Sequence, residues 1–164
     1  MMVLSLIMDK NFKRINFGRK KGNLLTNQRI VDFILDRLER YFKLSLFKPF
    51  NKVIKRFRDS NIPEITNFEY LVNYNINKPI SYLYLTKYKG ITFCYYIVGS
   101  TRNNAKIYST IQRFGPELFE KETMFEGYLI DDIFLVNDIV VHEGHTISKP
   151  LEVRIKTINE ILNY

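Results

Sequence analysis

The feature that most constrains the fold is the stretch 80–98, which is rich in aromatic and β-branched residues and has no helical period. Such side chains pack well on a pleated sheet, so the stretch predicts strands. The predicted strands are 80–98 with a break near 87–90, Lys106–Ile111, Met124–Ile130 and Ile133–His142. Turns are expected between them at Gly115-Pro116, Asp131-Asp132 and His142–His145.

Helical spacing is found on both sides of this stretch. Thr26 or Asn27 is a candidate cap for a helix that reaches about Phe42, and Pro150 is placed to open a final helix. Two further short helices are expected over 49–58 and 68–74, and the basic segment 9–23 is expected to be a flexible loop. The order of helices, strands and a last helix predicts an α+β fold, with an N-terminal helical region (1–78) packing on a core (79–164).

The charge balance bears on the partners of the chain. The 164 residues include 25 Lys and Arg against 17 Asp and Glu, which gives a net charge of +8. A basic surplus favours polyanions such as nucleic acid or nucleotides, although a basic, solvated surface is the alternative. The single cysteine, Cys94, can form no disulfide within the chain. With no signal peptide or membrane segment recognised, we expect an intracellular protein without a membrane partner, in the cytoplasm, nucleus, viral factory or virion.

Five short elements follow one another in a fixed order through the second half of the chain. They are Lys87-Tyr88-Lys89-Gly90, Arg113–Phe119, Thr123–Ile130 with Glu126-Gly127, Phe134–Ile139 with Asp138, and Glu143-Gly144 before a helix containing Arg154. This ordered set resembles the nucleotidyltransferase superfamily of mRNA capping enzymes and DNA ligases, and their snurportin-like cap-binding relatives. The resemblance implies an antiparallel-sheet nucleotidyltransferase-like core preceded by N-terminal helices.

The resemblance also implies which residues form a site. Lys87 matches the lysine that forms a covalent lysyl-nucleotide in the family. The residues implied to bind the nucleotide are Lys89, Gly90, Arg113, Glu126, Gly127 and Asp138. Magnesium or manganese would be needed only if the chain is active, because the metal neutralises charge on the phosphates. No metal site is predicted from the residues themselves, since His142 and His145 belong to a turn.

Several positions depart from the family pattern. Lys89 stands where the family has Asp, Thr92 where it has Arg, and Tyr128 where it has a metal-positioning carboxylate. The family's later phosphate-binding strands are expected after the last helix, but this sequence ends at Tyr164. We therefore expect a domain that binds GTP, an mRNA cap or an RNA 5′ end without transferring guanylate. Two alternatives remain open: a non-enzymatic assembly subunit that retains only the fold, and an active guanylyltransferase completed by a protein partner.

Overall fold

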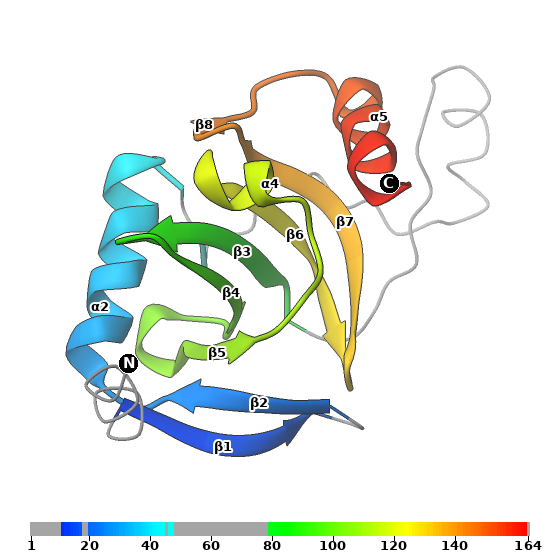
Figure 1. The fold of residues 1–164 in the computed structure, drawn as a ribbon. Coiled ribbons are helices and arrows are strands. Elements are labelled where there is room, and N and C mark those ends of the chain that lie inside the picture. The colour runs from blue at the N-terminus through cyan, green and yellow to red at the C-terminus, as the bar shows by residue number, and fades with distance from the viewer. Residues whose placement is uncertain (1–10, 18–19, 45, 48–78, 164) are drawn as a thin grey trace, which may run out of the picture.

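The computed structural model describes residues 11–17, 20–44, 46–47 and 79–163. In this part of the chain the strands form one eight-stranded antiparallel sheet, in the order β1-β2-β5-β4-β3-β6-β7-β8 (Figure 1). The strands are β1 (Phe12–Phe17), β2 (Lys20–Leu25), β3 (Ser81–Tyr88), β4 (Ile91–Val98), β5 (Lys106–Thr110), β6 (Thr123–Ile130), β7 (Ile133–His142) and β8 (His145–Thr146). The sheet therefore unites the two halves of the sequence, because β2 pairs with β5 across more than eighty residues.

Helices lie on both sides of this sheet. They are α2 (Gln28–Asp36), the π-helical turn η1 (Arg37–Tyr41), the short η3 (Arg102–Asn104), α4 (Pro116–Glu120) and α5 (Leu151–Leu162). Figure 1 shows α2 along one side of β3 and β4, with α4 and α5 near the ends of β6 and β7. Asn27 caps α2 by accepting a hydrogen bond from the backbone N–H of Arg29 at 3.0 Å.

Two apolar clusters cover the two faces of the sheet. Along β3 the side chains alternate, so Tyr82 and Tyr84 join the cluster beneath α2, while Leu83 and Leu85 join the cluster with α4 and α5. The first cluster also contains Leu35 and Leu38, and the second contains Phe119, Phe125 and Ile158. Because both faces are covered, the central strands are apolar on both sides.

The predicted α+β class, with a nucleotidyltransferase-like core and N-terminal helices, is wrong for the described residues. They form a mostly antiparallel sheet with a few helices. The main difference lies in the basic segment 9–23, predicted to be a loop. Phe12–Leu25 instead folds into the β1–β2 hairpin, in which Arg14 pairs with Asn23 and Asn16 with Lys21. Strand pairing with β5 outweighs the poor local strand propensity of this segment.

Most of the other predicted helices and strands agree with the structure. The helix expected up to Phe42 is confirmed by α2 and η1, and the strands expected after Pro79 are confirmed by β3 to β7. Gly115-Pro116, predicted as a turn, opens the short helix α4. The expected helices over 49–58 and 68–74 lie outside the described residues. Within the described part of the chain, no helix is both long and apolar enough to cross a membrane.

Candidate functional site

The β3–β4 hairpin carries the lysines singled out from the sequence. Lys87 lies near the end of β3, and the turn itself is formed by Lys89 and Gly90, with φ angles of 49° and 81°. The Lys87 ammonium binds the Glu120 carboxylate of α4, with 2.7 Å between Nζ and Oε1, and this contact lowers the pKa of Glu120. Lys87 is therefore engaged with a carboxylate, whereas Lys89 lies at the exposed tip with its Nζ 5.5 Å from the centre of the Tyr88 ring.

Glu126 and Asp138 face each other across β6 and β7 and are both buried. The Asp138 carboxylate accepts two hydrogen bonds from the guanidinium of Arg154 on α5, at 2.8 and 3.0 Å, and one from the backbone N–H of Ile139. Both carboxylate oxygens of Asp138 thus hold α5 against the sheet. This arrangement favours a structural role for Asp138 over the nucleotide contact inferred from the resemblance.

Gly127 is required by the close approach of β6 and β7. A Cβ atom built on Gly127 would lie 2.0 Å from the backbone oxygen of Leu135. The register between the two strands shifts next to this glycine, between Glu126 and Gly127. Gly127 therefore fits a β-bulge that brings the two backbones together.

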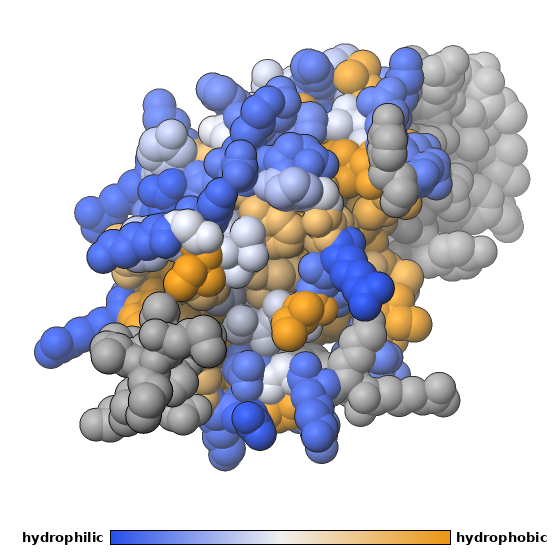
Figure 2. All heavy atoms as spheres, in the orientation of Figure 1, coloured by the Kyte–Doolittle hydropathy of each residue, from blue (hydrophilic) through white to orange (hydrophobic). Residues whose placement is uncertain are grey.

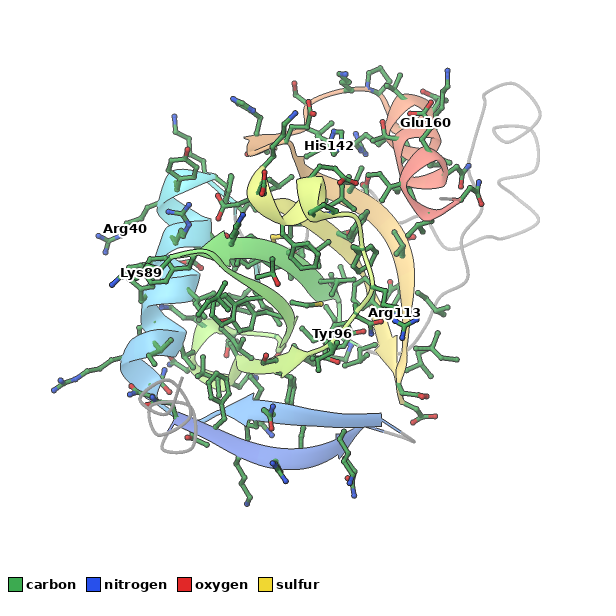
Figure 3. The ribbon with its side chains drawn as sticks, viewed as in Figure 1. Arg40, Lys89, Tyr96, Arg113, His142 and Glu160 are labelled. Atoms are coloured by element: carbon green, nitrogen blue, oxygen red, sulfur yellow. The ribbon has the colours of Figure 1, made fainter. Side chains whose placement is uncertain are left out.

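Arg113 lies in the segment between β5 and α4 and is exposed. Its neighbour Gln112 donates a hydrogen bond to the Tyr96 hydroxyl at 2.8 Å, which holds this segment on the sheet. Figure 3 shows Arg113 and Tyr96 in the right half of the view and Lys89 on the left side. The structure therefore does not gather the predicted site residues: Lys89 and Arg113 lie apart, and Glu126 and Asp138 are buried in the sheet.

Removing the Asp138 side chain should lower the stability of the fold and leave ligand binding unchanged. We expect Asp138→Ala to lower the free energy of unfolding by about 2 to 3 kcal/mol, because it leaves the mostly buried Arg154 guanidinium without its carboxylate. Urea denaturation measures this loss, and the double variant with Arg154→Ala should lose less than the sum of the two single variants. Normal stability combined with lost ligand binding would instead assign Asp138 to a site.

A buried network around Glu122 was not predicted from the sequence. Glu122 Oε1 accepts hydrogen bonds from the Tyr84 hydroxyl at 2.5 Å, the Thr86 hydroxyl at 2.8 Å and Arg37 Nε at 3.2 Å, and Arg37 Nη2 lies 2.9 Å from Oε2. Burial raises the pKa of Glu122, but these donors outweigh it and hold the pKa below its ordinary value. The network joins η1, β3 and the segment after α4.

A dense basic segment coincides with the β1–β2 hairpin. Residues 11–31 contain six Lys and Arg and no Asp or Glu. Lys13, Arg14 and Lys21 of this hairpin are exposed, and so is Arg29 in the first turn of α2. Among the described residues, no carboxylate forms an ion pair with any of these four cations. We name Lys13, Arg14 and Lys21 the basic hairpin, a surface that suits a polyanion.

The carboxylates implied by the resemblance do not fit a magnesium or manganese site. The oxygens of Asp138 are bound by Arg154, and Tyr128 replaces the further carboxylate. In the described part of the chain, no group of three or more His, Cys, Asp or Glu residues is arranged to hold a metal ion. In comparisons with known proteins, the sequence matches no family model and no curated protein.

Proposed function

We propose that this protein binds the 5′ end of RNA without catalysing a reaction. Its motifs resemble those of mRNA capping enzymes. The observation that carries the proposal is the basic hairpin. Its exposed cations have no carboxylate partner among the described residues, and residues 11–31 contain no acid. Phosphates that bind such cations release counterions, which provides affinity without any sequence-specific contact.

The tip of the β3–β4 hairpin supports the preference for a 5′ end. Tyr88 is exposed, and the Lys89 ammonium lies 5.5 Å from its ring centre. An ammonium suits a terminal phosphate, and an exposed ring suits a base or a methylated cap. Tyr88 and Lys89 lie at the tight turn of the β3–β4 hairpin. The end of an RNA chain can reach such a turn more easily than an internal nucleotide can.

Catalysis is not part of the proposal, because the groups expected to perform it are engaged elsewhere. Lys87 binds Glu120, and Asp138 binds Arg154. We expect no covalent label after incubation with α-labelled GTP or ATP and magnesium or manganese, followed by a denaturing gel. A labelled band that disappears in Lys87→Ala would contradict this part of the proposal.

The preference for a 5′ end should depend on Lys89. We expect Lys89→Ala to reduce the preference for 5′-triphosphate over 5′-hydroxyl RNA about tenfold, because a charge-assisted contact to phosphate is lost. Fluorescence anisotropy with the two labelled RNAs measures the preference, with cap analogue and GTP as competitors. Lys149→Ala, which removes an exposed lysine elsewhere, serves as the matched control. An unchanged preference in Lys89→Ala would exclude the hairpin tip as the 5′-end site.

Cations on an edge strand have a second effect, which has to be separated from their effect on RNA binding. They discourage edge-to-edge association of sheets, and β1 is at the edge of this sheet. Sedimentation of the wild type and of a variant without these cations distinguishes the two roles. Loss of RNA affinity while the variant stays monomeric supports binding, and aggregation with unchanged RNA affinity supports edge protection.

A second candidate function is an interaction or assembly subunit. Figure 2 shows an apolar area near the centre of the viewed face, surrounded by hydrophilic residues. Ile111, Ile133 and Leu135 are exposed large hydrophobic residues, and such groups are common where proteins associate. Normal partner association after Lys89→Ala, together with no binding of RNA by the wild type, would favour this function.

A further inference from the structure

The outer side of the helix formed by α2 and η1 alternates cations with aromatic rings. Residues four positions apart lie on the same side of a helix, which brings Arg29, Phe33, Arg37 and Tyr41 into line. We name these four residues the cation–aromatic stripe. The opposite side of the helix contributes Val31, Leu35 and Leu38 to the core. The stripe is therefore not needed for packing this helix on the sheet.

The two rings of the stripe are exposed to solvent. Phe33 is 59% exposed and Tyr41 is 63% exposed. The Arg37 guanidinium carbon lies 5.0 Å from the centre of the Tyr41 ring, so the two side chains lie against each other. A single exposed aromatic residue is ordinary on a protein surface, but two that alternate with arginines along one helix form a patterned surface.

A third ring stands next to the stripe. Tyr88 is 57% exposed and lies two residues after Thr86, so both side chains are on the same face of β3. Thr86 and Arg37 bind the same Glu122 carboxylate, which places Tyr88 on the side of β3 that faces Arg37.

We infer that the cation–aromatic stripe binds the body of a single-stranded RNA, with bases stacked on Phe33 and Tyr41 and a phosphate near Arg29. Arg37, whose guanidinium is held by Glu122, supports the Tyr41 ring. Every base has a face that can stack on an aromatic ring, so this mode accepts any sequence but needs unpaired bases. Phe33 and Tyr41 are eight residues apart, which corresponds to about 12 Å along a helix and leaves room for more than one nucleotide between them. The inference rests on the proposed function and extends it from the RNA end to the strand.

Charge favours a polyanion over a protein as the occupant. Residues 28–41 contain three acidic side chains and three arginines. Asp36 and Glu39 are bound by Arg102 at 2.6 and 2.5 Å, and Asp32 accepts a hydrogen bond from Gln28 at 3.0 Å. The positive charge that favours a polyanion therefore comes from Arg29 together with the adjoining basic hairpin. Arg29 begins the stripe directly after the basic hairpin. The hairpin and the start of α2 are joined by hydrogen bonds from Asn27 and Thr26 to Asn11, both 2.7 Å long. A strand bound to the hairpin can thus continue along α2.

The experiment measures binding of a labelled 5′-hydroxyl single-stranded RNA, which has no end phosphate for the hairpin tip. We expect Phe33→Ala and Tyr41→Ala to weaken binding about tenfold each, and Phe33→Tyr to keep most of the affinity because it keeps a ring. Leu162→Ala, which removes another exposed apolar side chain on α5, is the matched control and should change nothing. Thermal unfolding of each variant shows whether the variant is folded. If Phe33→Ala does not fold, Tyr41→Ala and Phe33→Tyr still test whether binding depends on the rings.

Further outcomes separate this inference from the proposed function. Unchanged affinity in both alanine variants, or an equal loss for duplex and single-stranded RNA, would overturn stacking on the stripe. A loss restricted to single strands supports it, even when the wild type shows no preference for a 5′-triphosphate. Phe33→Ala and Tyr41→Ala could also bind RNA as the wild type does and keep the preference for a 5′-triphosphate. That result would support the proposed function and show that the stripe has no part in it.

Discussion

Glu122→Ala is expected to lower the free energy of unfolding by about 3 kcal/mol at neutral pH. The substitution leaves the buried hydroxyls of Tyr84 and Thr86 without their acceptor and removes the carboxylate that holds Arg37. Buried polar groups that lose a partner bear the full cost of desolvation, which exceeds the net value of the bond. Arg37 is partly exposed and recovers water contacts, which is why the expected loss is not larger.

The same carboxylate predicts how stability depends on pH. The pKa of Glu122 is depressed in the folded protein, because the hydrogen bonds from Arg37, Tyr84 and Thr86 outweigh burial. A depressed carboxyl pKa contributes stability that is fully present above the unfolded value of about 4.5 and is lost as the pH falls through the folded value. Glu122→Gln should therefore be less stable at neutral pH and show a weaker loss of stability on acidification than the wild type.

Chemical denaturation of both proteins at neutral pH and below the unfolded pKa of Glu122 measures this difference. Glu120→Gln is the matched control, since it removes the exposed carboxylate that binds Lys87 and should change stability little. Parallel acid profiles for wild type and Glu122→Gln would mean that the network does not hold the fold together. Equal stability of Glu122→Ala and wild type would lead to the same conclusion.

Neutralising the basic hairpin should have the largest effect on RNA binding. We expect the triple variant Lys13→Gln, Arg14→Gln and Lys21→Gln to lose about a hundredfold in affinity at low salt. If all three cations contact phosphates, the slope of log affinity against log salt for a single strand should fall by about 2. No carboxylate among the described residues pairs with these cations, so their removal leaves no unpaired partner and should not unfold the protein.

The matched control for this variant removes the same charge elsewhere. Lys106→Gln, Lys149→Gln and Lys156→Gln replace exposed lysines of β5, of the segment before α5 and of α5 itself. We expect a small loss of affinity from the lower net charge and an almost unchanged salt slope. Equal losses in the two triple variants would assign binding to net charge alone and would remove the basic hairpin from the account.

The strands after Pro79 could be predicted because their residues carry the signal locally. Aromatic and β-branched side chains fill β3, β4, β6 and β7, and the turns between them contain Gly90, Asp131 or Gly144 at positive φ. The helix after Asn27 was predictable for a similar reason, since a capping residue precedes a regular apolar spacing. These features need no knowledge of distant partners.

The hairpin β1–β2 could not be predicted in the same way. Its strands are rich in Lys, Arg, Asn and Gly, which favour loops in isolation, and their pairing with β5 depends on residues more than eighty positions away. The fold class was wrong because these two strands were assigned to a loop. The Glu122 network was missed because its partners lie 36 to 85 positions away in the sequence.

The predicted site residues illustrate the limit of reasoning from motif order. Lys87, Lys89 and Gly90 were expected on a strand and turn, and the structure places them there. Motif order gave no information on side-chain partners, however, so the ion pairs of Lys87 with Glu120 and of Asp138 with Arg154 were not anticipated. The roles assigned to these residues remain predictions.

The proposed function depends on the binding of RNA 5′ ends by the basic surface of this protein. The most direct test is a titration of the wild-type protein with a labelled 5′-triphosphate single-stranded RNA, repeated at increasing salt and competed with the 5′-hydroxyl RNA. We expect saturable binding that weakens steeply with salt and is tighter for the triphosphate. Binding that is absent, or that neither depends on salt nor distinguishes the two ends, would contradict it.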